Sequence, residues 1–534
     1  MCPSGSPRRR RDVRPPGAPS PEETPLDPRR HLLIPSPLPE QALSELGRTE
    51  GGPDTLALLV RDQQVRRLLL LRAVLDVVEE ADAEICPPAL RQRFRTDWAL
   101  LEEADRAGEA EEPPGEGKSV RHSPARTQIL YPLVGPWARG CLRALSTKTI
   151  PRTARQRRAR SLRRELGYFS ALAAAAAVRA GVPFSARLSA YDGVLALPSL
   201  GALGAIGGGD VEVVARDGRM TLRRRGEADV VVDVMERDDL TAFGVGLGLA
   251  PVTGFATRSA ATAWRPVHLL PGLLPESAPV PLDDLDPHRT VDGGSRHQAL
   301  SGPATLDRAE RERWLTSWAG VRSILQLGGE HRVAEVAALL RCLVPLAPPA
   351  GHGAPDGGTG SCSGTRREAF GAVLSSTPPT SATFAATLVH EVQHAKLAAL
   401  SDMVVLHREG PQKRYFAPWR PDSRPYDGLL QGAYSHVALA DFFQRCALAA
   451  TPRPEQRSIA WGEHARYRAQ VRVTLPVLAA STALTAQGRL LVDRLTEACE
   501  RMGEEPPPRG MQIRAEERVS AAHARWVRCR TPAE

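Results

Sequence analysis

The segment TFAATLVHEVQHAKLAAL, residues 383–400, constrains this chain most, because it joins an apolar helical pattern to two histidines four residues apart. No Gly or Pro interrupts the pattern, and the flanking residues are apolar or small, so we expect a helix buried in a core. In such a helix His390 and His394 project from the same face, about one turn apart. Two imidazoles at this spacing can chelate one metal ion.

Glu391 follows the first histidine and completes the pattern HExxH. In metallopeptidases a Glu at this position activates the metal-bound water and carries its proton to the leaving amine. The longer pattern HExxHxxGxxH fails here, because Leu397 and Leu400 stand where it needs Gly and His. Lys396 also places a charge shortly after the second histidine, which we interpret as a feature against proteolysis.

A third metal ligand must come from another segment, and we predict His436. It lies in a second apolar helical pattern, GLLQGAYSHVALADFFQRCAL at residues 428–448, where a buried imidazole needs a partner. The alternative interpretation is a core histidine that is hydrogen-bonded to a carbonyl group. Asp441 is the carboxylate alternative. The remaining candidates after the first helix are Asp402, His407, Glu409, Asp422 and Asp427.

The loop between the two helical patterns, RYFAPWRPDSRPYDG at residues 414–428, holds three arginines among aromatic residues and prolines. Arginine recognises carboxylates through two parallel hydrogen bonds. Near a metal, Arg420 and Arg424 would suit an anionic co-substrate such as a 2-oxo acid, and Arg414 and Arg489 are further candidates. Ion pairs that staple the loop are the alternative for each of them.

Helical patterns dominate the rest of the chain. Residues 56–81 form an amphipathic pattern, and residues 161–181 form another that Gly181 and Pro183 close. A helical pattern returns at residues 306–346.

One stretch departs from this trend, because apolar and polar residues alternate at 211–225 around Asp217-Gly218, a strong hairpin signal. Residues 230–235 and 264–270 are expected to extend the hairpin. We therefore predict a mainly α fold with a small antiparallel β-sheet, an α+β class, in which a zincin-like HExxH helix packs against the second ligand-bearing helix.

Composition along the chain suggests three regions. Residues 1–30 are rich in Arg, Pro, Ser and Glu without aromatic residues, so we expect a disordered tail. Residues 31–300 form a helical N-terminal region that contains the small sheet at about 185–270. Residues 301–534 form the helical domain with the HExxH site.

Charge and cysteine usage exclude several classes of protein. Part of the net charge of +9 comes from the first 30 residues, where seven arginines face four acidic residues. This segment lacks the interleaved aromatic residues of a nucleic-acid-binding segment, so we expect no nucleic-acid partner. The eight cysteines contain no CxxC pair, which argues against a disulfide framework. No signal peptide and no run of 18 apolar residues is present, so we expect a cytoplasmic protein without a membrane partner.

Three segments carry a resemblance to a known family: STPPTSATFAATLVHEVQHAKLAALSDMV, YFAPWRPDSRP and LLQGAYSHVALADFF. They resemble the HExxH-motif peptide-modification family, described as 2-oxoglutarate-dependent HExxH-type peptide beta-hydroxylases. The opening HLLIP at residue 31, the helix RRLLLLRAVLDVV and PLDDLDPHR at 281–289 look like the same family. The likeness covers about residues 31–500.

The resemblance implies Fe(II), 2-oxoglutarate and oxygen, with hydroxylation at the beta carbon of a residue in a ribosomally made precursor peptide. His390 and His394 match the two metal ligands of the motif, and His436 is expected to supply the third. Arg420 and Arg424 are candidates to hold the distal carboxylate of 2-oxoglutarate. Glu391 would then orient neighbouring groups or position the proton or the substrate. Other peptide-maturation enzymes are the expected partners.

Two alternatives stay open. A zinc metallopeptidase that processes a peptide would use the same two histidines with Glu391 as general base. A scaffold that binds a leader peptide and recruits a partner enzyme would need no metal, and the edge of the predicted hairpin could accept a peptide strand. That scaffold would keep its full function in His390→Ala.

Overall fold

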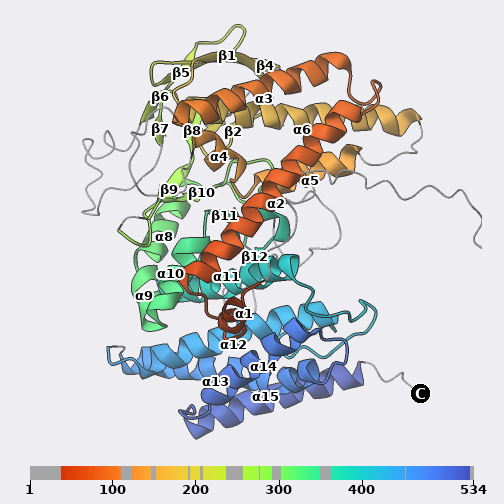
Figure 1. The fold of residues 1–534 in the computed structure, drawn as a ribbon. Coiled ribbons are helices and arrows are strands. Elements are labelled where there is room, and N and C mark those ends of the chain that lie inside the picture. The colour runs from red at the N-terminus through yellow and green to blue at the C-terminus, as the bar shows by residue number, and fades with distance from the viewer. Residues whose placement is uncertain are drawn as a thin grey trace, which may run out of the picture. The chain divides into compact units, whose positions relative to one another are not determined.

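The computed structural model describes residues 38–109, 123–145, 152–190, 193–204, 209–235, 256–275, 277–290, 302–348, 362–451 and 453–529 (Figure 1). The predicted disordered tail lies outside these residues. Residues 39–534 form one compact unit. Its hydrophobic cores combine residues from both sides of position 300, for example Leu56 with Leu388 and Phe169 with Leu374. The predicted division near residue 300 therefore does not fall between separate cores.

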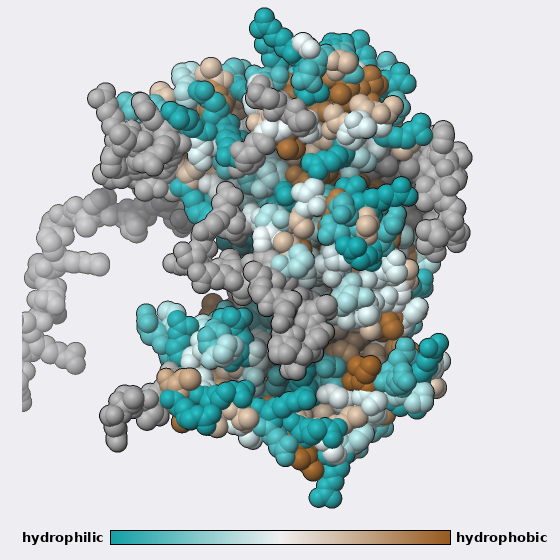
Figure 2. All heavy atoms as spheres, turned by 180° about the vertical axis from the view of Figure 1, so that it is seen from behind, coloured by the Kyte–Doolittle hydropathy of each residue, from teal (hydrophilic) through white to brown (hydrophobic). Residues whose placement is uncertain are grey.

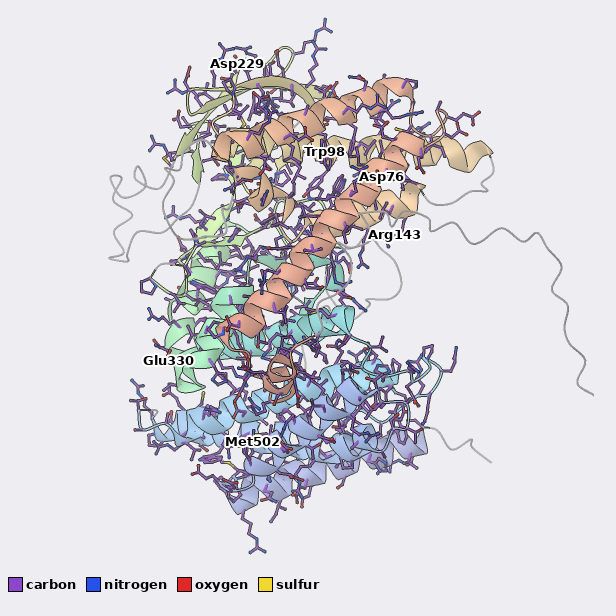
Figure 3. All side chains as sticks on the ribbon, viewed as in Figure 1. Asp76, Trp98, Arg143, Asp229, Glu330 and Met502 are labelled. Carbon is purple, nitrogen blue, oxygen red and sulfur yellow. The ribbon has the colours of Figure 1, made fainter. Side chains whose placement is uncertain are left out.

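The described part of the chain is mainly helical, as predicted. The predicted helices at 56–81 and 161–181 are confirmed as α2 and the second half of α6. Aromatic rings connect α3 to α6: the ring of Trp98 on α3 stacks on that of Phe169 on α6, with 5.8 Å between the ring centroids. Trp98 is labelled in Figure 3. The first helices are α1 (Glu40–Gly47), α2 (Pro53–Glu80), α3 (Pro88–Glu109), α4 (Pro124–Ile129), α5 (Val134–Leu145) and α6 (Arg152–Arg179).

The predicted hairpin is confirmed as β4 (Asp210–Arg216) and β5 (Arg219–Arg223). Asp217 and Gly218 connect them with φ angles of 53° and 68°, as a two-residue turn with left-handed residues requires. The complete sheet has the order β1-β4-β5-β6-β7, and all its pairs are antiparallel. Its other strands are β1 (Phe184–Ser189), β6 (Val230–Met235) and β7 (Ala256–Arg258).

The prediction of a single sheet was wrong. Residues 264–270 do not extend the hairpin, because they divide into β8 (Trp264–Pro266) and β9 (His268–Leu270), which join two other sheets. One of these has the order β2-β3-β8, with β2 (Leu195–Leu197) and β3 (Gly201–Leu203).

The third sheet, with the order β12-β13-β11-β10-β9, is mixed rather than antiparallel, since β11 pairs in parallel with β10 and β13. Residues alternate between its two faces: Leu343 and Val373 join the core that contains α11, while Val344 and Leu374 join the core that contains α2, α5 and α6. The sheet therefore lies between two cores. Its remaining strands are β10 (Val280–Leu282), β11 (Cys342–Leu346), β12 (Ser363–Thr365) and β13 (Ala372–Ser376).

The helical prediction for 306–346 was wrong at its end, where residues 342–346 form β11. A short apolar run such as CLVPL fits a strand that is buried on both faces, and Pro345 lacks the N–H of a helix interior. The helices in this stretch are α8 (Arg308–Ala319), α9 (Val321–Leu327) and α10 (Glu330–Leu339), and a short 3-10 helix, Arg367–Ala369, follows β12.

The C-terminal part packs helix on helix (Figure 1). The HExxH helix α11 (Ser381–Met403) packs against α12 (Tyr426–Leu448), and α12 packs in turn against α13 (Pro454–Ala479). Two more helices, α14 (Ala486–Arg501) and α15 (Arg509–Arg528), lie against α13. Seen from the opposite side, the coloured surface is largely hydrophilic, with apolar residues in small groups (Figure 2). No helix in the described ranges has the length and apolar character needed to cross a bilayer.

The segment PLDDLDPHR at 281–289 carries three buried carboxylates, Asp283, Asp284 and Asp286. Asp283 accepts a hydrogen bond from the Tyr131 hydroxyl at 2.5 Å, and Asp286 accepts one from the Tyr168 hydroxyl at 2.7 Å. Burial raises the pKa of Asp286 to about 7, and the nearby charge of Asp283 acts in the same direction. These contacts fix the segment to Tyr168 on α6 and to Tyr131, which lies just after α4.

Candidate metal centre

The helix that carries the HExxH pattern, Ser381–Met403, contains the predicted residues 383–400 and extends beyond them by two residues at its start and three at its end. The Thr380 hydroxyl caps its first turn by accepting a hydrogen bond from the N–H of Thr383 at 3.1 Å. Apolar residues, among them Phe384, Leu388 and Leu400, are completely buried on the core side. That packing holds the helix in place and turns its two histidines toward α12.

The Nε2 atoms of His390 and His394 lie 3.1 Å apart. The Nδ1 atom of His394 is 3.1 Å from the side-chain oxygen of Gln431 on α12, so this oxygen can accept the Nδ1 proton and leave a lone pair on Nε2. Two nitrogens at this separation, each about 2.05 Å from a shared metal ion, would subtend about 98° at the ion. The pair thus has the spacing of two ligands of one metal.

Burial favours the uncharged form of two of the histidines. It lowers the pKa of His390 well below the usual value, and positive charge on His394 or His436 would lower it further. It also lowers the pKa of His436 to about 3, with His394 and Arg466 acting in the same direction. Neutral imidazole is the form that binds a metal ion, so His390 and His436 need not lose a proton near pH 7.

His436 lies beside the pair on α12, and its ring centroid is 5.7 Å from that of His390. Trp419 and Tyr467 pack edge-on against it at 4.6 and 4.9 Å. Its Nδ1 atom is buried and has no hydrogen-bond partner in the described chain. Among the described residues no group of three or more His, Cys, Asp and Glu side chains is arranged to hold a metal, so His436 as third ligand stays a prediction.

Glu391 is 2% exposed and faces β12. Its Oε1 atom accepts a hydrogen bond from the Ser363 hydroxyl at 2.7 Å, while Oε2 is buried and has no hydrogen-bond partner in the described chain. Burial raises the pKa of Glu391, and the charge of His394 and hydrogen bonds from Ser363 and Thr365 act against this rise. The carboxyl group thus has one oxygen fixed by the sheet and one available.

The carboxylate candidates for the third ligand are engaged elsewhere. Asp441 accepts from Arg332 at 3.2 Å and from Arg445 at 2.9 Å. Asp402 pairs with Arg367. The other candidates are also placed in pairs: Glu409 with Lys413, Asp422 with Arg420, and His407 with Asp427.

The arginines that the sequence suggested for a co-substrate take the alternative role in this structure. Arg420 donates to Asp422 at 2.8 Å, and Arg424 lies 3.4 Å from the same carboxylate, on a loop where all three are partly exposed. Arg489 donates to the carbonyl groups of Ala479 and Ser481, so it too secures a loop. Among the described residues, no hydrogen bond or ion pair links Arg420 or Arg424 to His390, His394 or His436.

Sequence reasoning missed several residues around the site. Trp419, which directly precedes Arg420, is the loop residue that reaches His436. Gln431 lies five residues before His436 on α12, a spacing that does not put the two side chains on one helical face, so no periodic signal marks it. Arg466 on α13 lies over the Tyr467 ring at 4.2 Å, and its charge acts on His436. It resembles the many other arginines of α13 in the sequence, so no local signal marks it.

A small open cavity borders His394 between the end of β12 and the HExxH helix. Thr365, Arg367 and His394 line it, together with three small residues of α11: Ala395, Ala398 and Ala399.

No protein-family model matches the chain, and no curated protein matches it.

Proposed function

We propose that this chain is an Fe(II)- and 2-oxoglutarate-dependent oxygenase of the cytoplasm that hydroxylates the beta carbon of a residue in a ribosomally made precursor peptide, alongside other peptide-maturation enzymes. The observation that carries a metal-dependent function is the convergence of the His390 and His394 Nε2 atoms at 3.1 Å in a buried site. The choice of reaction rests on the resemblance of the HExxH, PWR and AYSH segments to the peptide hydroxylases.

The donor set fits a metal with open positions. His390 and His394 would hold the ion. His436, whose Nδ1 atom has no hydrogen-bond partner among the described residues, is the candidate for a third ligand. When bound, the iron ion would allow one atom of O₂ to enter a substrate C–H bond while the other oxidises 2-oxoglutarate to succinate and CO₂. Three neutral imidazoles leave the full charge of the ion uncompensated, which favours an anionic chelator such as 2-oxoglutarate.

The surrounding residues have supporting roles in this proposal. Gln431 fixes the tautomer and the orientation of His394. Trp419 and Tyr467 exclude water from His436. Arg420 and Arg424 would have to exchange Asp422 for the co-substrate carboxylate. Arg466 is the alternative, because its charge acts on His436 from the neighbouring helix, and it would have to exchange Glu463 in the same way.

Anaerobic titration of 2-oxoglutarate into the Fe(II)-loaded protein tests the proposal. We expect the visible charge-transfer absorption of a metal-chelated 2-oxo acid, and its loss in His390→Ala. His436→Ala, Arg420→Ala and Arg466→Ala would show which of these residues acts in the site. His523→Ala, which removes an exposed histidine of α15, is the control and should keep the band. Absence of the band in the iron-loaded parent protein would reject the oxygenase.

A zinc metallopeptidase is the second candidate, and the state of Glu391 favours it. A buried carboxyl group with a raised pKa and a free Oε2 atom, next to two metal-ligand histidines, suits a general base. This enzyme would cleave a precursor peptide encoded beside its gene in the presence of Zn²⁺, and Glu391→Gln would abolish cleavage. The two candidates differ in the product, because the oxygenase gives an intact peptide that is heavier by one oxygen atom.

A further inference from the structure

β12 is the edge strand of the mixed sheet, and no described strand pairs with its outer side. It pairs with β13 in the register Ser363↔Ser375, Gly364↔Leu374 and Thr365↔Val373. The N–H of Ser376 donates to the carbonyl of Cys362 at 2.9 Å, so the pair just before this register is a hydrogen-bonded one.

Hydrogen-bonded and non-hydrogen-bonded pairs alternate along antiparallel strands. Gly364 therefore bonds to β13, while the N–H and C=O groups of Ser363 and Thr365 point away from the sheet. Among the described residues, no main-chain hydrogen bond occupies these outward groups. An edge of this kind can accept one more extended strand.

The same strand borders the candidate metal centre. The Ser363 side chain donates to Glu391, the residue between the two metal-ligand histidines in the helix. Thr365, at the other end of β12, lines the cavity that His394 also lines. A strand added to β12 would run about 4.8 Å from it, and alternate side chains would point toward the face of the sheet that α11 covers.

We infer that β12 is the docking strand for the substrate, which binds as an extended peptide segment and places one side chain in the cavity beside His394. Ala395, Ala398 and Ala399 line the cavity with small side chains, so a small substrate side chain can approach His394 there. The main-chain pairing fixes the distance of that side chain from the histidines. Main-chain hydrogen bonds would give affinity that does not depend on the peptide sequence, and the cavity would select which peptide residue lies beside His394. The inference rests on the proposed function only for the substrate being a peptide.

Thr365→Pro tests the strand directly. Proline removes the outward N–H and fills the space beside it, yet leaves the Gly364 bonds to β13 intact. Thr365→Val is the matched control, because it keeps the N–H and the branched side chain. Both variants should unfold at temperatures close to that of the parent protein.

A library of random dodecapeptides serves as the probe. It is first depleted on the Thr365→Pro protein and then enriched on the parent protein, both without metal. We expect enriched peptides that bind the parent and Thr365→Val alike, and bind Thr365→Pro about tenfold more weakly, since a hydrogen bond and a close approach are lost. Bound peptide should slow hydrogen exchange at the amides of Ser363 and Thr365. N-methylation of alternate peptide residues should abolish this binding.

Either of two results would overturn the inference: no peptide enriched after depletion, or enriched peptides that leave the Ser363 and Thr365 amides unprotected. The proposed function fails separately. Because the peptides are selected without metal, peptide binding at β12 together with a missing charge-transfer band would reject the oxygenase and keep the docking strand. A charge-transfer band together with peptide binding that Thr365→Pro does not weaken would keep the oxygenase and reject the docking strand.

Discussion

Lys396 and Glu335 form an ion pair that is withdrawn from water, with Nζ donating to Oε1 at 2.7 Å and the side chains 0% and 1% exposed. Glu335 also accepts from Arg332 at 3.0 Å and from Gln393 at 3.2 Å. Lys396 follows His394 by two residues, so it lies on the opposite side of the helix and contacts α10. The sequence argument that Lys396 counts against proteolysis therefore loses its basis, because this charge does not face the metal-ligand side.

Glu335 is the common partner in this cluster, so its loss should cost most. Glu335→Leu would leave the Lys396 ammonium buried without a carboxylate, and we expect a destabilisation of about 3–5 kcal/mol. Lys396→Met should cost less, because Glu335 keeps its bond to Arg332. Urea unfolding of both variants measures the difference. Equal losses would show that the two cations do not share Glu335 in the way the structure indicates.

Gln431 should tune metal affinity through His394. Gln431→Leu removes the acceptor for Nδ1 and should weaken metal binding about 10- to 100-fold, the range usual for residues that orient a ligand. Gln431→Glu keeps an oxygen acceptor and should bind the metal with an affinity near that of the parent. Competition with a chromophoric chelator gives both constants. Unchanged affinity in Gln431→Leu would mean that the hydrogen bond does not hold the ring.

Asp286 should make stability depend on pH. Its pKa is raised from an ordinary value of 3.8 to about 7, so the unfolded chain loses this proton first as pH rises. Between pH 4 and 7 the folded state binds more protons, and its contribution from Asp286 therefore decreases as pH increases. The contribution is fully present below pH 4 and lost above 7.

Asp286→Asn isolates this effect, because it keeps an oxygen to accept from Tyr168 and cannot ionise. The unfolding free energy of the parent minus that of the variant should fall by at most about 1.4 kcal/mol per pH unit across this range. Histidines whose pKa is lowered, such as His288, change stability in the opposite direction but cancel in the difference. A difference that stays flat with pH would contradict the raised pKa.

Local sequence patterns were sufficient for the two site helices. The apolar pattern at 383–400 corresponds to Ser381–Met403, which buries nearly half of its residues, and the one at 428–448 corresponds to Tyr426–Leu448, which buries most of its residues. The pattern at 342–346 was ambiguous, because a fully buried strand and a buried helix turn have the same apolar run. Residues 342–346 form a strand because they pair with β10 and β13. Such pairing joins segments that are distant in sequence, so a local pattern does not show it.

The candidate metal centre also combines features that the sequence could predict with features that it could not. His390 and His394 share a face because of helix geometry alone, so their convergence could be predicted. Ser363 contacts Glu391 only because β12 lies beside α11, and the sequence separation of 28 residues gives no periodic signal. Trp419 reaches His436 from a loop whose course depends on packing. The arginines of that loop were predicted by composition, and Asp422, two residues from each, pairs with both.

Thr49, in the turn between α1 and α2, has a φ of 61°, a left-handed conformation that a β-branched residue rarely adopts. Its carbonyl oxygen accepts from Lys396 at 3.0 Å and from Arg332 at 2.7 Å. Lys396 and Thr49 are 347 residues apart, so the buried ammonium gains its second acceptor only when distant parts of the chain have met. Closing so long a loop is slow. During synthesis the HExxH helix can therefore complete its surroundings only after the turn that contains Thr49 has packed against it.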